Sequence, residues 1–130
     1  MSKPNLATEL LQKWTSAIKN GDPKQVTSLY HEDGILLGTF SPKERVGHEL
    51  ILEYFEGLLK SPVEVQIVSE HPHVFESFAV NSGLYNFITD SKTINARFSF
   101  AYSKGNKFGI PQNIAEWKII AHHSSILPEN

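Results

Sequence analysis

The sequence predicts an α+β fold, because helical periodicity dominates its first half and strand-like alternation dominates its second half. Apolar residues recur at helical spacing over residues 4–20 and again over residues 47–60. From residue 63 onward the apolar period changes to two, which is typical of strands. No repeat, low-complexity tract or linker interrupts this order. We therefore expect one domain over residues 1–130, with helices that cover a mostly antiparallel sheet.

The first half of the chain is expected to hold three helices and one short strand. Apolar stripes at helical spacing place the helices at residues 4–20, 23–31 and 47–60. Asp22, a residue type that suits a helix N-cap, precedes the second helix. The short strand is expected at residues 35–39. Because each helix has one apolar stripe, the three can cover one face of a sheet.

The second half is expected to form four long antiparallel strands. They fall at residues 63–75, 78–89, 93–102 and 114–125, with a bulge in the first and a turn over residues 90–92 before the third. A strongly bent sheet wrapped around three helices makes a cone whose open end is a pocket. The third strand has a mainly aromatic face (Ile94, Ala96, Phe98, Phe100 and Tyr102) and a mainly small, polar one (Asn95, Arg97, Ser99 and Ala101).

Composition narrows the classes of function and the compartment. The chain has no cysteine, which excludes disulfides, thiolate nucleophiles and cysteine-ligated zinc. Its net charge is −2 and no lysine–arginine cluster follows a helix face, so we expect no nucleic acid partner. The apolar runs are far shorter than the ~20 residues that span a bilayer, and no secretory signal is visible. We therefore expect a cytoplasmic protein with no membrane partner.

Four stretches, in this order and spacing, resemble a known family. They read Ile-Lys-Asn-Gly-Asp at residues 18–22, Val-Gly-His at 46–48 with Tyr-Phe-Glu-Gly-Leu-Leu at 54–59, Pro-His-Val at 72–74, and Trp-Lys-Ile-Ile-Ala-His-His-Ser-Ser at 117–125. They make the chain similar to the association (hub) domain of calcium/calmodulin-dependent protein kinase II (CaMKII). That domain belongs to the nuclear-transport-factor-2-like (NTF2-like), or SnoaL-like, superfamily of cone-shaped α+β domains.

The resemblance implies self-association. Hub domains pair into dimers, and the dimers assemble into closed rings that hold kinase domains outside. This chain shows neither a Gly-rich loop nor a His-Arg-Asp catalytic loop, so it carries no kinase catalytic segment. Because the sequence Met-Ser-Lys-Pro leads almost directly into the first helix, we expect a stand-alone hub-like protein in preference to an excised domain.

The superfamily also leaves an enzymatic alternative open. Some relatives are isomerases, dehydratases or cyclases that use an Asp or His as general base inside the cone. In this chain Asp22, Asp33 and Asp90 fall at expected caps or turns, and no Asp–His pair occupies inward strand positions. We therefore expect no catalytic residue and no cofactor. A SnoaL-like small-molecule enzyme stays the alternative, and a binding module without higher assembly is the third reading.

The pocket of the cone is expected to bind a small carboxylate. The resemblance places the arginines of animal hubs at Phe87, Ser99 and Ser124, while Arg97 lies on the same strand face as Ser99. A guanidinium binds a carboxylate through two parallel hydrogen bonds. The predicted ligand-binding residues are Arg97, Tyr85, His122, Ser99 and Ser124.

Two other interpretations concern the same residues. Arg97 can have a structural role, held by Asp90, Glu116, a backbone carbonyl or a neighbouring subunit. A metal site at His122 and His123 is disfavoured, because adjacent strand residues point to opposite faces of a sheet. We therefore expect no bound metal.

Apolar residues on both faces of the predicted strands support self-association. Leu84 and Ile88 share one face, while Tyr85 and Phe87 share the other. A sheet that is covered on one face only shows a cleaner alternation. We therefore expect the second face to be buried against another copy of the chain. The alternative is that these are the single exposed apolar residues that any protein surface carries.

Overall fold

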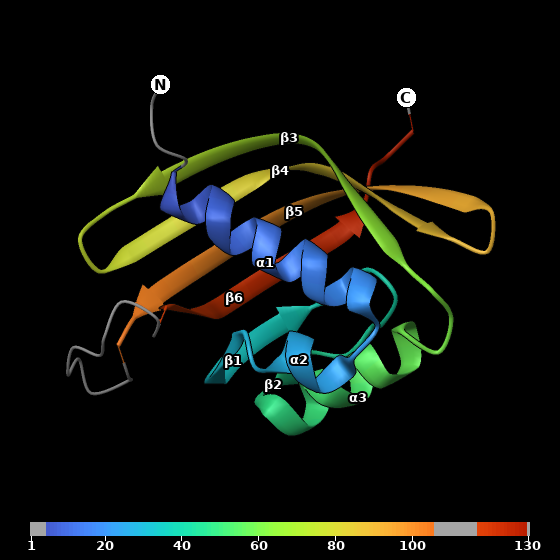
Figure 1. The fold of residues 1–130 in the computed structure, drawn as a ribbon, viewed down its shortest axis with the longest axis horizontal. Helices are drawn as coiled ribbons and strands as arrows, with labels where there is room; N and C mark the ends of the chain where they lie inside the picture. Colours follow the sequence, from blue (N-terminus) through green and yellow to red (C-terminus); the bar gives the residue numbers. More distant parts are fainter. Residues whose placement is uncertain (1–4, 106–116, 130) are drawn as a thin grey trace.

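The structure is an α+β fold built on one sheet, and Figure 1 shows its arrangement. It is a computed structural model that describes residues 5–105 and 117–129. The elements, in chain order, are α1 (Leu6–Asn20), α2 (Pro23–Thr27), β1 (Tyr30–Leu37), β2 (Arg45–Val46), α3 (His48–Leu58), β3 (Glu64–Val74), β4 (Phe78–Thr89), β5 (Lys92–Lys104) and β6 (Trp117–Ile126). The predicted class, with three helices and a mostly antiparallel sheet, is confirmed.

The sheet has six strands in the order β2-β1-β6-β5-β4-β3. Neighbouring strands are antiparallel except β1 and β6, which are parallel. β6 therefore lies in the middle of the sheet, although it comes last in the chain. This position brings its side chains next to those of β1, a strand for which the sequence alone indicates no pairing partner.

The ends of α1 follow from its capping residues. The Asn5 side chain accepts a hydrogen bond from the Ala7 N–H at the N-terminus. At the C-terminus, Gly21 has φ 77°, in the left-handed region that a residue without Cβ adopts at low cost. The buried face of α1 carries Leu11, Trp14 and Ile18, at the helical spacing that the sequence predicts.

The segment between α2 and β1 differs from the prediction. The sequence predicts a helix up to His31 and a strand over residues 35–39, whereas α2 ends at Thr27 and β1 begins at Tyr30. Pairing with β6 explains the difference: Tyr30 pairs with Ile119, whose N–H donates to the Leu29 carbonyl at 2.9 Å. A long-range strand pair therefore overrides the local helical pattern.

Two bulges shape the sheet. β3 shifts against β4 between Ile67 and Ser69, inside the stretch where the sequence predicts a bulge. β6 shifts against β5 because Ile119 pairs with Tyr102 and Ala121 pairs with Ala101, which leaves one extra residue between them. An extra residue changes the face on which every later side chain lies. The start of the last strand predicted at residue 114 lies outside the described residues.

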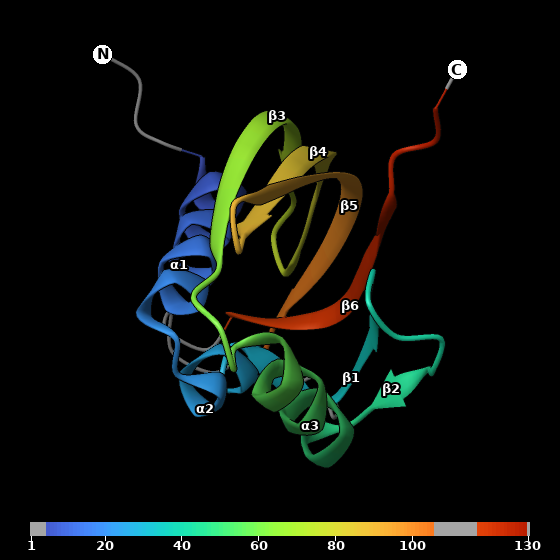
Figure 2. The same cartoon turned by 90° about the vertical axis from the view of Figure 1, so that its right-hand side faces the viewer.

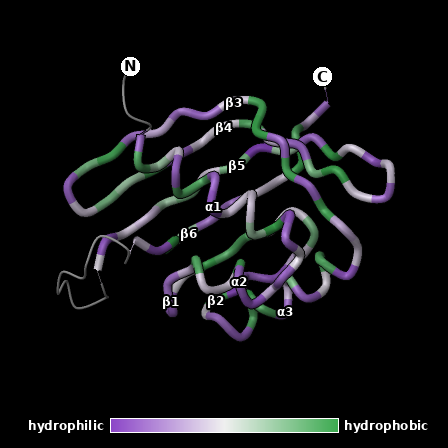
Figure 3. Tube along the Cα trace, viewed as in Figure 1, coloured by the Kyte–Doolittle hydropathy of each residue, from purple (hydrophilic) through white to green (hydrophobic). Residues whose placement is uncertain are grey.

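The helices lie on one side of the sheet, which we call the inner face (Figures 1 and 2). On β5 the inner face consists of Ala96, Phe98, Phe100 and Tyr102, all of them buried as their alternation predicts. The opposite, outer face of β5 carries Arg97, Ser99 and Ala101, and none of these is buried. Within the described residues no helix covers the outer face. Figure 3 shows hydrophobic and hydrophilic residues mixed along every strand, as expected for a sheet with two different faces.

Candidate functional site

Three of the predicted site residues meet in the interior of the cone. Tyr85 on β4 and His122 and Ser124 on β6 lie on the inner face and are buried. The bulge in β6 places His122 and Ser124 on the same face as Ile119. The Tyr85 hydroxyl lies 3.2 Å from Nε2 of His122 and donates to Oγ of Ser124 at 2.6 Å. The sequence prediction that these three residues share one cavity agrees with this geometry.

A chain of hydrogen bonds extends from these residues to α1 and β1. Nε1 of Trp14 donates to the Tyr30 hydroxyl at 3.1 Å, and that hydroxyl lies 2.7 Å from Nδ1 of His122. An indole N–H can only donate. The proton of the Tyr30 hydroxyl is therefore free to be given to Nδ1 of His122. Nε2 of His122 then carries the proton and donates to the Tyr85 oxygen, and Tyr85 donates to Ser124.

This interior chain holds His122 in its neutral form. Burial, with a smaller contribution from the nearby His123, lowers the pKa of His122 to about 3. Both ring nitrogens are already engaged with tyrosine hydroxyls. Burial likewise raises the pKa values of Tyr30 and Tyr85, so both hydroxyls stay protonated. The interior is an uncharged, internally satisfied network.

Little empty space remains beside the network. A cavity of about 10 Å³ is lined by residues of α1, α3, β1, β4 and β6, and none of them is Asp or Glu. One water molecule needs about that much space. The aromatic rings of Trp14, Tyr54, Phe55 and Phe87 occupy the volume that a ligand needs. Among the described residues, this cavity thus has neither a carboxylate in its lining nor space for more than about one water molecule.

Arg97 and Ser99 are not part of this interior, so the prediction that all five residues share one cavity is wrong. Alternation along β5 sets Arg97 and Ser99 opposite the buried aromatic face of that strand, so they cannot share the inner face with Tyr85. The observed turn has two residues, Asp90 and Ser91 at φ 49° and 65°, and Arg97 pairs with Leu84. Directly paired residues of neighbouring strands lie on the same face of a sheet, and Leu84 points to the outer face of β4. Arg97 and Ser99 consequently lie exposed on the outer face.

A separate, open hollow lies around Arg97 on the outer face. It measures about 230 Å³ and is lined by Arg97, Ser99, His123 and Ser125, with Phe98 at its base. Nε of Arg97 donates to Oγ of Ser125 at 3.2 Å. We call this hollow the outer groove. The partner of Arg97 is thus a serine, which is not among the predicted partners; of those, Glu116 lies outside the described residues.

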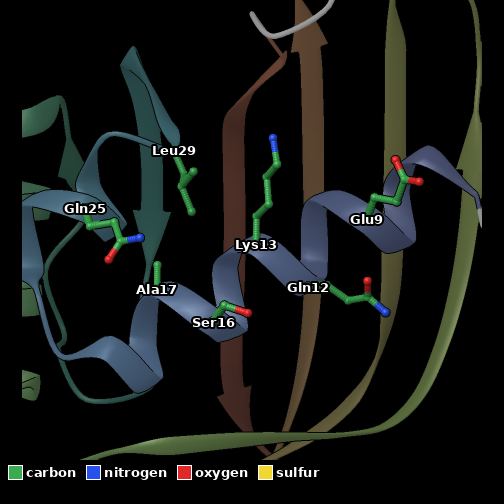
Figure 4. Close-up of a pocket in the computed structure, with 7 residues that line it drawn as sticks. All are labelled: Glu9, Gln12, Lys13, Ser16, Ala17, Gln25 and Leu29. Atoms are coloured by element: carbon green, nitrogen blue, oxygen red, sulfur yellow. The ribbon is translucent and has the colours of Figure 1, made fainter.

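The remaining features carry less chemistry. A hollow of about 440 Å³ follows the solvent side of α1, and Figure 4 shows its polar lining, with Gln12 and Ser16 among the labelled residues.

Within residues 5–105 and 117–129, no three His, Cys, Asp or Glu side chains are arranged to hold a metal ion. None of the described helices has the length and apolar character needed to cross a membrane.

Sequence reasoning missed three members of the interior chain. Trp14 reads as an ordinary core residue of α1, and Tyr30 falls in the segment predicted as helix. Thr39, which lies 2.5 Å from Ser124 through their hydroxyl oxygens, falls after β1. No local signal marks these residues as polar partners of His122, because β1 and β6 become neighbours only through the parallel pairing.

The fold and its interior define the class of protein: an NTF2-like cone. A protein from Pseudomonas putida KT2440 described as NTF2-like has 15% sequence identity and a TM-score of 0.78, covering 95% of this chain and 85% of that one. A protein from Parabacteroides distasonis, provisionally described as a ketosteroid isomerase, has 20% identity and a TM-score of 0.73, covering 95% of this chain and 89% of that one. At these identities the likeness shows the fold alone.

The family follows from a closer match. The model of the calcium/calmodulin dependent protein kinase II association domain matches residues 5–128, so the chain belongs to this family. A protein from Xanthomonas campestris, provisionally assigned to the same association domain, is 31% identical with a TM-score of 0.86, over 100% of this chain and 91% of that one. No curated protein sequence matches the chain.

Proposed function

We propose that this chain is a self-associating hub whose subunits pair through the outer face of the sheet. Family membership supports the proposal, since the matching model describes an association domain. The observation that carries it is the uncovered outer face. Leu84 and Ile88 on β4 point to that side and remain partly exposed. Such residues become fully buried only if another surface covers them.

The centre of the outer face is suited to the approach of a second sheet. Ala101 on β5 pairs with Val80 on β4 and with Ala121 on β6, so one row across the sheet has only small or medium apolar side chains. In the next row, Ser82 and Ser99 join through their hydroxyls at 2.8 Å. Short side chains allow two sheets to pack closely, at the ~10 Å spacing of stacked sheets.

A ring needs a second contact besides the one that makes the dimer, because a single two-fold interface closes after two subunits. The end of the β3–β4 hairpin is our candidate for this contact. Phe75 and Phe78 are 60% and 40% exposed there, and their rings stack with centroids 6.2 Å apart. Figure 3 shows hydrophobic residues on both arms of this end of the hairpin. We propose that another copy of the chain covers this aromatic pair.

An Ala101→Arg variant tests the proposed dimer face. It places a long charged side chain in the centre of the outer face, where solvent accepts it in a monomer but a packed sheet does not. We expect light scattering to give the mass of a monomer and far-ultraviolet circular dichroism to stay unchanged. Gln12→Arg, an exposed change on α1, is the matched control and should assemble normally. Normal assembly of Ala101→Arg would refute the proposed face.

We also propose a small carboxylate ligand, now in the outer groove. The guanidinium of Arg97, with Ser99 and His123 beside it, supplies hydrogen-bond donors that suit a carboxylate. This ligand would lie at the proposed dimer face, not in the interior. The enzymatic alternative, suggested by structural neighbours provisionally described as an isomerase and a dehydratase, gains no support from an interior cavity whose described lining has no carboxylate.

A further inference from the structure

A small pocket between α1 and the end of the sheet is separate from both the interior chain and the outer groove. It measures about 60 Å³. Its apolar walls come from Leu10 on α1, Leu29 before β1, and Trp117 and Ile119 on β6. A single water needs roughly 10–15 Å³ of such space, so the pocket is large enough for a ligand of a few heavy atoms.

Tyr102 also lines this pocket, and its hydroxyl has no hydrogen-bond partner. The residue is 1% exposed, and this oxygen is the only buried side-chain nitrogen or oxygen without a partner in the described part of the chain. Leaving a buried hydroxyl unpaired destabilises the folded chain, because the group has lost its hydrogen bonds to water. Burial, aided by the charge of Glu70, raises the pKa of Tyr102, so the hydroxyl stays protonated and can donate. An acceptor atom placed in the pocket removes the cost.

The charged residues of the pocket are both cationic. Lys13 on α1 and Lys118 on β6 line it, and no carboxylate does so among the described residues. Lys118 is held by the Ser28 carbonyl, to which its Nζ donates at 2.8 Å. Lys13 is exposed and makes no ion pair within the described ranges. Figure 4 shows Lys13 projecting from α1 on the side where Leu29 lies.

We propose that this pocket binds a small amphiphilic anion, a short-chain carboxylate. The carboxylate accepts a hydrogen bond from the Tyr102 hydroxyl and forms an ion pair with Lys13. Its short alkyl part packs between Leu10 and Trp117. The small volume excludes long acyl chains. This site does not depend on pairing through the outer face, because Tyr102, Trp117 and Ile119 are buried on the inner face.

Fluorine NMR of the full chain labelled with 5-fluorotryptophan tests the site, with butyrate as the probe. The chain has two tryptophans, and Trp14 belongs to the interior chain. A Trp117→Phe variant identifies the Trp117 signal. We expect butyrate to shift this signal saturably and to leave the Trp14 signal in place. Butyramide, which matches butyrate in shape but has no charge, should bind at least about tenfold more weakly.

Four variants separate this proposal from its competitors. Lys13→Gln and Tyr102→Phe should each weaken butyrate binding by about tenfold, because each removes a hydrogen bond to a charged group. Lys19→Gln, on the same helix, and Arg97→Ala, in the outer groove, should leave it unchanged. Tyr102→Phe should fold normally, since it removes a hydroxyl that has no partner.

Four results would overturn the proposal. The first is the absence of a saturable shift of the Trp117 signal. The second is equal binding of butyrate and butyramide, which would make the pocket a purely apolar hollow. The third is unchanged butyrate affinity in Tyr102→Phe, which would mean that the hydroxyl is bonded to water only. Loss of butyrate binding in Arg97→Ala would place the ligand in the outer groove and also overturn it.

Discussion

The hydroxyl of Tyr30 lies 2.7 Å from Nδ1 of His122, across the parallel pairing of β1 and β6. This contact joins the side chains of β1 and β6 in the middle of the cone, so we assign these buried polar residues a structural role. Where a catalytic relative would need an accessible base, His122 has both ring nitrogens engaged and a pKa lowered to about 3. The members of this network are hydrogen-bonded to one another in their neutral forms, which offsets the cost of burying polar groups.

The depressed pKa of His122 predicts acid sensitivity. Since the folded state keeps this side chain neutral, the unfolded state binds more protons below about pH 6.5, the ordinary histidine value. The stabilisation is complete above that pH and declines as the pH falls towards about 3. The free energy of unfolding should therefore fall by up to about 1.4 kcal/mol for each pH unit in this window. Urea denaturation at a fixed protein concentration measures the slope.

A His122→Gln variant should reduce that slope, because glutamine offers a donor and an acceptor but does not titrate. Its matched control is His71→Gln, an exposed histidine on β3. The control should keep the slope of the unaltered chain. If both variants give the same slope as that chain, the neutral state of His122 is not the source of the acid sensitivity.

Gly83 on β4 should not tolerate a side chain. A Cβ at this position would lie 2.1 Å from the backbone oxygen of Ser69, at the bulge of β3. Gly83→Ala should therefore lower the free energy of unfolding by about 1–3 kcal/mol, as overpacking does. Gly57→Ala is the control, because a Cβ there meets nothing within 4 Å and alanine favours the helix by about 0.5–1 kcal/mol. Equal stabilities of the two variants would contradict the close approach at the bulge.

Loss of the exposed aromatic pair should stop assembly at the dimer. Replacing both Phe75 and Phe78 with Ser removes the stacked rings at the hairpin end but leaves the outer face of the central strands intact. Sedimentation velocity should then show a single species of two subunits. Replacing Phe40, which is 42% exposed elsewhere, with Ser tests whether any exposed phenylalanine matters. Larger assemblies in the double variant would exclude the hairpin end as the second contact.

The outer groove should bind a dicarboxylate through Arg97. Malonate titrated into the ¹⁵N-labelled chain should move the backbone signals of Ser99 and His123 and leave that of Tyr85 in place. Arg97→Ala should abolish these changes, whereas Lys92→Ala, at the exposed start of β5, should not. Movement of the Tyr85 signal without the others would return the ligand to the interior of the cone.

Much of the fold could be predicted from the sequence because local signals and topology agree there. The apolar stripe of α1, its stop at Gly21 and the aromatic face of β5 all depend on side-chain period alone. The bulge in β3 is likewise visible as a break in alternation. The position of β1 could not be predicted in this way, since its extent depends on pairing with a strand some 90 residues later.

The candidate site was harder to predict, because it depends on register. Alternation from the buried Trp117 and Ile119 alone would place His122 and Ser124 on the other face of β6, and only the bulge returns both to the inner face. Asp90 and Ser91 adopt positive φ without a glycine, so the sequence carries no strong signal for the two-residue turn. The pairing of Arg97 with Leu84, which follows from this turn, could not be predicted either, although alternation along β5 already sets Arg97 opposite the aromatic face of its strand.

Native mass spectrometry of the unaltered chain tests the proposed self-association most directly. We expect closed assemblies with an even number of subunits at micromolar concentration, which release dimers on gentle activation. A spectrum that contains only the 14.6 kDa chain would contradict the account, because the outer face would then remain uncovered in solution.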